Sequence, residues 1–265
     1  MVPTKKINGI DIYYEIHGEG EPVIFGNGVF ANTARWVYQT PVFSKEFQVI
    51  LYDMRGQGQS DKPEGPYSFD LHAEDQKGLL DELGFSKVHH VGISYGAELG
   101  LVFALKYPEM LKSLVVCSAV SYIGTLLRSM CELWRYACVS ADPEMFYHAT
   151  VPLNFGGNFI KDQAELLEMA KERYADLNYP ALVRLIDAFL ELNVTDELHK
   201  IKIPTCVIGG EEDILKPPYP YSDLIHQKIR NSEMTIVPGS GHAITFDKPE
   251  EFNTVVLGFL RKHSR

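Results

Sequence analysis

The chain has 265 residues, of which 45% are hydrophobic and 23% are charged. These are the fractions of an ordinary globular protein, so we exclude a disordered tail and a fibrous repeat. The 35 acidic residues outnumber the 25 basic ones and give a net charge of −10, which argues against binding to nucleic acids or to anionic membrane surfaces. No apolar run approaches the roughly 18 residues that span a bilayer, and the first residues lack a signal-peptide pattern. We therefore expect a cytoplasmic protein without membrane segments.

The first predicted elements are two strands, Thr4–Ile7 and Ile10–His17, which form a meander at the edge of a sheet. Short apolar runs then recur between turn residues, as expected for strands that are buried on both faces. These runs are Glu21–Gly26, Phe47–Tyr52, Lys87–Gly92, Ser113–Cys117, Pro204–Gly209 and Glu233–Pro238. Helical patterns separate most of them, and this alternation predicts an α/β fold: a mostly parallel, twisted sheet with helices on both faces.

Three of the helices have clear boundaries. Ser68 is a suitable cap for a helix that ends at Gly84, with apolar side chains at three- and four-residue spacings. A second helix begins at Tyr95 and ends before Pro108. A third begins near Pro249 and buries Phe252, Val255, Val256, Phe259 and Leu260.

From about Ser121 to Leu198 the alternation stops, and no strand is predicted. One apolar stripe consists of Leu167, Ala170, Tyr174 and Leu177, and a second consists of Leu182, Leu185, Ile186 and Phe189. We therefore predict a core of residues 1–120 and 198–265 with a helical lid inserted as residues 121–197.

The most informative segment is Gly92-Ile93-Ser94-Tyr95-Gly96, which follows a strand and opens a helix. In this context G-x-S-x-G forms a sharp strand-to-helix turn that exposes the serine hydroxyl beside unpaired helix N–H groups. The two glycines leave room for the neighbouring chain. We predict that Ser94 is a nucleophile.

On these residues the chain resembles the α/β-hydrolase superfamily, over nearly its full length. The resemblance implies the order serine, acid, histidine. It places the acid on Asp213, a few residues after a late strand, although the adjacent Glu211 and Glu212 leave the register open. It places the base on His242, in a glycine-flanked loop after the last strand. In such a triad the histidine deprotonates the serine, and the acid orients the histidine.

Acyl transfer also requires N–H donors for the oxyanion. We assign these to the backbone N–H groups of Tyr95 and Val29. Relatives usually have His-Gly in the second loop, where this chain has Asn27-Gly28. Asn27 either braces the loop or reaches the substrate, and we count it with Trp134 and Phe146 of the lid as candidate substrate-binding residues. The alternative for the lid aromatics is that they form the core of the lid.

Two further patterns are read as structural. The glycine-rich run Asp53–Asp61 lacks the end of a phosphate loop, so we interpret it as a turn in which Asp53 and Arg55 tie neighbouring segments. The four cysteines contain no C-x-x-C pair, which favours reduced, buried thiols. No group of His, Cys, Asp and Glu has metal-ligand spacing, and we predict neither a metal nor another cofactor.

A serine at the turn indicates acyl chemistry, because relatives that open epoxides or remove halides use aspartate there. We predict a hydrolase that cleaves a small carboxylic ester, lactone or thioester through an acyl-enzyme. Alternatives are a thioesterase on CoA or a carrier protein, with Arg128 and Arg135 as candidate cations, and a carbon–carbon bond hydrolase. A non-catalytic ligand-binding protein also remains open, as does acyl transfer to an acceptor other than water.

Overall fold

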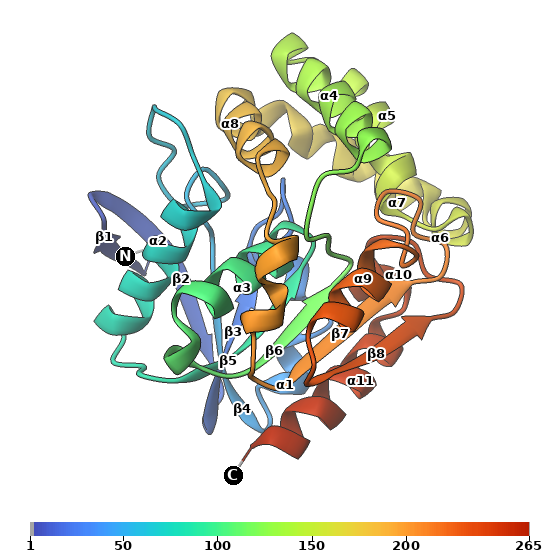
Figure 1. The fold of residues 1–265 in the computed structure, drawn as a ribbon. Helices are drawn as coiled ribbons and strands as arrows, with labels where there is room; N and C mark the ends of the chain where they lie inside the picture. Colours follow the sequence, from blue (N-terminus) through green and yellow to red (C-terminus); the bar gives the residue numbers. More distant parts are fainter. Residues whose placement is uncertain (1–2, 265) are drawn as a thin grey trace.

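A computed structural model describes residues 3–264 of the chain. Eight strands form one sheet in the order β1-β2-β4-β3-β5-β6-β7-β8 (Figure 1). Their bounds are β1 Thr4–Ile7, β2 Ile10–His17, β3 Glu21–Gly26, β4 Phe47–Tyr52, β5 Val88–Ile93, β6 Leu111–Cys117, β7 Thr205–Gly210 and β8 Ser232–Val237. β1 and β2 pair antiparallel at one edge, and every pairing from β4 to β8 is parallel. The predicted sheet is therefore confirmed.

The inner strands owe their burial to helices on both faces of the sheet. On one face α2 (Phe69–Glu82), α3 (Tyr95–Lys106) and α9 (Tyr221–Lys228) cover a large apolar cluster. On the other face α1 (Thr40–Phe43) and α11 (Pro249–His263) cover a smaller one. β8 departs from the expected burial, because at the edge of the sheet most of its residues stay partly exposed. None of the helices within residues 3–264 combines the length and apolar character needed to cross a membrane.

Between β6 and β7 the chain forms a layer of helices, which we call the helical insertion (residues 121–197). Its helices are α4 (Thr125–Ser140), α5 (Pro143–Asn154), α6 (Gly157–Asp162), α7 (Ala164–Lys171) and α8 (Tyr179–Leu190). Figure 1 shows them as a separate layer above the sheet. The remaining short helices are η1 Thr33–Trp36, η2 Pro108–Met110, η3 Glu172–Asp176, η4 Thr195–Lys200 and α10 Ile244–Asp247.

The apolar stripe predicted over residues 167–177 does not lie on a single helix. α7 ends at Lys171, and the chain continues as the 3₁₀ turn η3 before Leu177. Of the four stripe residues only Leu167 is fully buried. The stripe in α8 is confirmed, since Leu182, Leu185, Ile186 and Phe189 are all buried.

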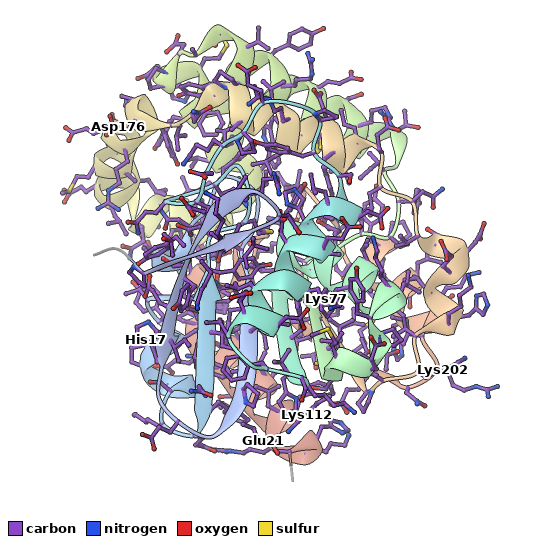
Figure 2. The ribbon with its side chains drawn as sticks, turned by 90° about the vertical axis from the view of Figure 1, so that its left-hand side faces the viewer. His17, Glu21, Lys77, Lys112, Asp176 and Lys202 are labelled. Atoms are coloured by element: carbon purple, nitrogen blue, oxygen red, sulfur yellow. The ribbon has the colours of Figure 1, made fainter. Side chains whose placement is uncertain are left out.

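The insertion lies at the carboxyl ends of the parallel strands. Glu21 begins β3 and forms an ion pair of 3.0 Å with Lys112, at the start of β6. Figure 2 shows this pair at one end of the molecule and Asp176 of the insertion at the other. Side chains that follow the strand ends therefore face the insertion, and this is where open parallel sheets bind their ligands.

Candidate active site

Ser94 occupies the turn between β5 and α3, with φ 53° and ψ −125°. A positive φ is costly for a residue with a Cβ and persists only where the surroundings enforce it. Here the Ser94 N–H donates to the carbonyl of Cys117, at 2.8 Å. A Cβ on Gly96 would overlap the backbone of Gly26, and one on Gly92 would overlap that of Gly96. The two glycines thus allow α3 to pack directly on the sheet and hold the turn in its strained form.

Asp213 and His242 meet beside this turn. The Nδ1 of His242 lies 2.8 Å from Oδ2 of Asp213, and both side chains are buried. The other carboxylate oxygen of Asp213 accepts hydrogen bonds from the backbone N–H groups of Leu215 and Lys216, at 3.0 and 2.8 Å. These two backbone hydrogen bonds fix the carboxylate of Asp213, and the carboxylate in turn fixes the orientation of the His242 imidazole.

The neighbouring carboxylates point elsewhere. Glu211 accepts a hydrogen bond of 2.9 Å from the backbone N–H of Gly239, on the loop that leads to His242. Glu212 contributes its backbone N–H to Ser240 of the same loop. Of the three adjacent acids, Asp213 is therefore the one that reaches the histidine.

The hydroxyl of Ser94 faces a lysine rather than the histidine. The Nζ of Lys216 donates to Oγ of Ser94 at 3.1 Å, and within residues 3–264 no hydrogen bond joins Ser94 to His242. Both residues nevertheless line one cavity of about 130 Å³. Transfer of the hydroxyl proton to His242 would require Oγ of Ser94 to turn from Lys216 toward the imidazole, and catalytic hydrogen bonds commonly form or shorten only when substrate is bound.

Lys216 belongs to a buried ion pair that the sequence reading missed. Its Nζ lies 2.7 Å from Oε1 of Glu98, and their side chains are only 2% and 0% exposed. Glu98 also accepts a hydrogen bond of 2.9 Å from the backbone N–H of Val120. Burial raises the pKa of the Glu98 carboxyl, and the ammonium of Lys216 opposes this effect. The available signal was a single carboxylate within the otherwise apolar first turns of α3.

The two residues assigned as oxyanion donors lie beside Ser94. Val29 lines the cavity, and Tyr95 is the first residue of α3. Neither backbone N–H donates a hydrogen bond to another of the described residues. Both groups are thus free to bind an oxygen atom of a ligand.

Asn27 is a correction to the predicted set of substrate-binding residues. Its Nδ2 donates to the carbonyl of Tyr52 at 2.9 Å, and its Oδ1 accepts from the indole N–H of Trp36 at 2.6 Å. The side chain is fully buried and lines neither of the two cavities at Ser94. The amide braces the loop that follows β3, which is the other role that the sequence left open.

Trp134 and Phe146 do line the space around Ser94. Phe146 faces the 130 Å³ cavity, and Trp134 faces a smaller chamber of about 10 Å³ that also contains Ser94 and Lys216. Both rings contact Phe30, with centroids 5.4 and 5.1 Å apart, and the indole N–H of Trp134 donates to the carbonyl of Ala149. These aromatics therefore serve the core of the insertion as well.

Arg35 is a second cation that the sequence reading did not find. It lines the 130 Å³ cavity beside Ser94, and its Nη2 donates to Oγ1 of Thr245 at 2.9 Å. Its guanidinium lies 5.6 Å from the centre of the Phe246 ring. Burial lowers the pKa of Arg35 to about 10. Because most of the other lining residues are apolar, Arg35 gives the cavity one positively charged wall.

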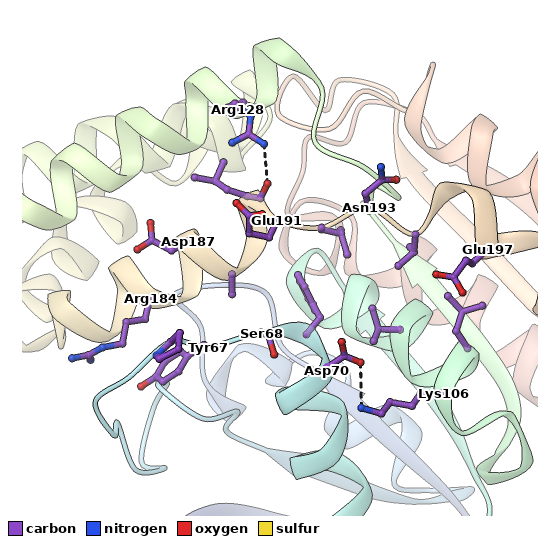
Figure 3. A pocket seen from close by; sticks show the side chains of 18 residues that line it. Tyr67, Ser68, Asp70, Lys106, Arg128, Arg184, Asp187, Glu191, Asn193 and Glu197 are labelled. Carbon is purple, nitrogen blue, oxygen red and sulfur yellow. Dashed lines mark hydrogen bonds and ion pairs between the residues drawn. The ribbon is translucent and has the colours of Figure 1, made fainter.

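A larger cavity of about 850 Å³ lies outside this site, between the start of α2, the end of α3 and α8 (Figure 3). It contains neither Ser94 nor His242. Among its charged groups, Lys106 contacts Asp70 at 3.2 Å, and Arg128 donates to the carbonyl of Leu190. Because the Ser94 turn and His242 both line the smaller cavity, we take that cavity as the candidate site.

The glycine-rich run after β4 is structural, as the sequence indicated. Asp53 accepts the backbone N–H groups of Thr33 and Gln59, at 2.8 and 2.7 Å. Arg55 forms a two-pronged ion pair with Asp75 of α2, at 2.7 and 2.8 Å. The run joins the sheet to α2 and to the segment that follows the oxyanion loop. Within residues 3–264, no three His, Cys, Asp and Glu side chains are grouped to hold a metal ion.

Comparisons with known proteins agree with this architecture. A family model described as the alpha/beta hydrolase fold matches residues 21–249. A protein of Azorhizobium caulinodans, provisionally named carbamate hydrolase RutD, is 29% identical over 252 residues, which cover 94% of each chain. The structure of MGS-M2, an α/β-hydrolase enzyme from a Medee basin deep-sea metagenome library, is 32% identical, with a TM-score of 0.94 over 98% of this chain and 97% of its own.

The enol-lactonase of Burkholderia xenovorans LB400 superimposes with a TM-score of 0.90 over 98% of this chain and 100% of its own. At 24% identity this is a likeness of fold alone. The matched family model, the relatives and the Ser94 turn agree, and the chain belongs to the α/β-hydrolase fold family.

Proposed function

We propose that the protein is a serine hydrolase that cleaves a small ester, lactone or thioester through an acyl-enzyme. The observation that supports this proposal best is that the contact of Asp213 with His242 lies at the carboxyl edge of the sheet and that His242 lines one cavity together with Ser94. The unpaired N–H groups of Val29 and Tyr95 lie beside Ser94. Asp213 orients the imidazole of His242, which accepts the proton of the Ser94 hydroxyl as the oxygen attacks the carbonyl carbon. The two N–H groups bind the resulting oxyanion.

The dimensions of the site favour a small substrate. The cavity at Ser94 measures about 130 Å³, well below the roughly 300–1,000 Å³ of pockets for drug-sized ligands. Its walls come from the core and from α5 of the helical insertion. We accordingly assign the insertion the role of a lid that shapes the acyl site. The name of the relative from Azorhizobium caulinodans, carbamate hydrolase, describes hydrolysis at a carbonyl carbon.

The other functions have weaker support. A thioesterase for CoA or a carrier protein would need free cations at the mouth, yet Arg135 is paired with Asp187 at 2.7 Å and Arg128 lines the outer cavity. A carbon–carbon bond hydrolase uses the same three residues, so substrate tests must include such compounds. A ligand-binding role without turnover predicts an unreactive Ser94.

The test is labelling with a small, uncharged fluorophosphonate, followed by peptide mapping. We expect one adduct, on Ser94, in the wild type, and we expect it to disappear in Ser94→Ala and fall at least about 1,000-fold in rate in His242→Ala. Ser129→Ala and His199→Phe, both on exposed surface, are matched controls that should label normally. A folded wild type that gives no adduct would overturn the proposal. Labelling would then be followed by turnover of esters, lactones, thioesters and ring-cleavage products.

A further inference from the structure

Lys216 lines the small chamber beside Ser94 and has no role in the proposed triad. Its Nζ contacts Oε1 of Glu98 at 2.7 Å and Oγ of Ser94 at 3.1 Å, and it lies 4.5 Å from the centre of the Phe189 ring. An ammonium has three donors and no acceptor. Two of its donors are therefore directed at the carboxylate and the serine oxygen, and the aromatic face covers the third side.

Burial of the Lys216–Glu98 ion pair is unfavourable for the stability of the folded state. Burial of two charges costs several kcal/mol per ion, and the attraction between them repays this only when the remaining polar atoms are satisfied. Here Oε2 of Glu98 has no hydrogen-bond partner among residues 3–264. Apolar residues of similar volume would fit among Cys131, Trp134 and Ile186, which line the same chamber. The pair is thus poorly explained as a stabilising element.

The position of Lys216 next to Oγ of Ser94 offers an explanation for the buried pair. Glu98 and Phe189 hold Nζ in place without any help from Ser94, so the ammonium keeps its position beside Ser94 when the serine side chain turns. The carboxylate lies behind the ammonium and offsets its charge, so the cation adds little repulsion to an imidazolium at His242. A fixed N–H donor aimed at an oxygen that gains negative charge is worth more in a dry site than in water.

We infer that Lys216 is a fourth catalytic residue, which stabilises negative charge on Oγ of Ser94 as that oxygen attacks and later leaves, and that Glu98 is its positioning residue. In acylation the Oγ–carbon bond forms, the hydroxyl proton passes to His242, and the carbonyl electrons move to the oxyanion. The oxyanion then collapses, the bond to the leaving group breaks, and His242 gives its proton to the leaving alcohol or thiol. In deacylation His242 takes a proton from a water molecule that attacks the acyl carbon, the Oγ–carbon bond breaks, and His242 gives this proton to Oγ. Lys216 keeps all its protons throughout and only donates a hydrogen bond.

This inference rests on the proposed function, and the test separates the two. The rate of labelling by the same neutral fluorophosphonate reports attack by Oγ without a deacylation step. In Lys216→Met we expect this rate constant to fall about 10- to 100-fold, as expected when a charge-assisted donor is lost. Lys262→Met, which removes the cation of an exposed ion pair with Glu233, should label at the wild-type rate.

A second variant excludes a merely structural role. Lys216→Met alone leaves Glu98 buried without its partner, and this destabilises the fold. The double variant Glu98→Met with Lys216→Met removes both charges and should recover thermal stability, yet its labelling should stay 10- to 100-fold slow. A folded double variant that labels within twofold of the wild type would overturn the role of Lys216. An unreactive wild type would instead overturn the proposed function itself.

Discussion

His72 and His90 are fully buried histidines of the core, and neither belongs to the candidate site. Burial lowers the pKa of each to about 3, and Arg55 adds a smaller effect at His72. Both rings are therefore neutral in the folded protein but regain an ordinary pKa near 6.5 in the unfolded chain. Because the unfolded state then binds more protons, the stability contributed by each ring is complete above pH 6.5 and is lost as the pH falls toward 3.

We predict that His72→Phe removes part of this acid sensitivity. Neither ring nitrogen of His72 has a hydrogen-bond partner among the described residues, and the ring packs edge-on against Tyr95 and Tyr67. At pH 5 the wild-type ring should cost about 2 kcal/mol of stability relative to pH 7, at about 1.4 kcal/mol per pH unit. Urea unfolding of both proteins at pH 7 and pH 5 measures the difference.

The exposed His199 supplies the control for this measurement. His199→Phe should leave the change in unfolding free energy between the two pH values as it is in the wild type. If His72→Phe also retained the full change, the burial of a neutral His72 would not be its source.

Single residues also mark the limits of sequence reading. The positions of Ser94, Asp213 and His242 along the chain follow from a local motif and a resemblance, so they could be proposed before any geometry was known. The contact of Lys216 with Glu98 joins residues 118 positions apart. No local sequence pattern predicts such a pair. Asn27 was assigned to the substrate because its role as a brace depends on Tyr52 and Trp36, which only the fold brings near.

Among the structural elements, hydrogen bonds connect the helical insertion to the loop that holds His242. The carboxylate of Asp247 accepts the backbone N–H groups of Gly241 and Gly156, at 2.6 and 3.1 Å. The N–H of Ala243 donates to the carbonyl of Asn154 at 2.7 Å. The histidine loop and the end of α5 therefore share their hydrogen bonds.

We predict that Asp247→Ala loosens both segments together. Two backbone N–H groups lose their acceptor, which costs about 1–3 kcal/mol for each group left unsatisfied in a buried place. Hydrogen exchange followed by mass spectrometry should show faster exchange in residues 154–160 and in residues 239–243. Asp162→Ala, at an exposed position of α6, should change neither segment. Faster exchange in only one of the two would contradict the coupling.

Elements differed in how far the sequence determined them. The strands and α2 were predicted well, because buried strands leave short apolar runs and because Ser68 caps α2 by accepting the N–H of Leu71. The stripe over 167–177 satisfied helical spacing but splits at Lys171. An apolar stripe stabilises one continuous helix only where its side chains pack against a buried surface. Ala170 and Tyr174 are only partly buried.

For the molecule as a whole, the cavity at Ser94 is assembled from two layers that are distant in the sequence. Gly28 and Val29 come from the core, whereas Val151 and Phe155 come from the insertion. Substrate size should therefore be set by the insertion and reactivity by the core.

We predict that Phe155→Ala shifts the preferred acyl chain toward longer esters without abolishing turnover. The ring of Phe155 lines the cavity and stacks on Phe159, with centroids 4.8 Å apart, whereas Phe159 does not line the cavity. Phe159→Ala is thus a matched control that removes the same stack. Relative kcat/KM for acetate, butyrate and octanoate esters should change in the first variant only. An equal change in both would locate the chain-length limit elsewhere.

The strand order has a consequence for synthesis of the chain on the ribosome. β6 is a central strand of the finished sheet, but its partner β7 is made only after the whole insertion. Until Thr205–Gly210 emerges, the nascent sheet ends in the long apolar edge of Leu111–Cys117, and such an edge invites pairing with other chains. The Ser94 turn has been made at that stage, whereas Asp213 and His242 have not. The nascent chain therefore exposes this apolar edge until just before the segment that carries Asp213 is made.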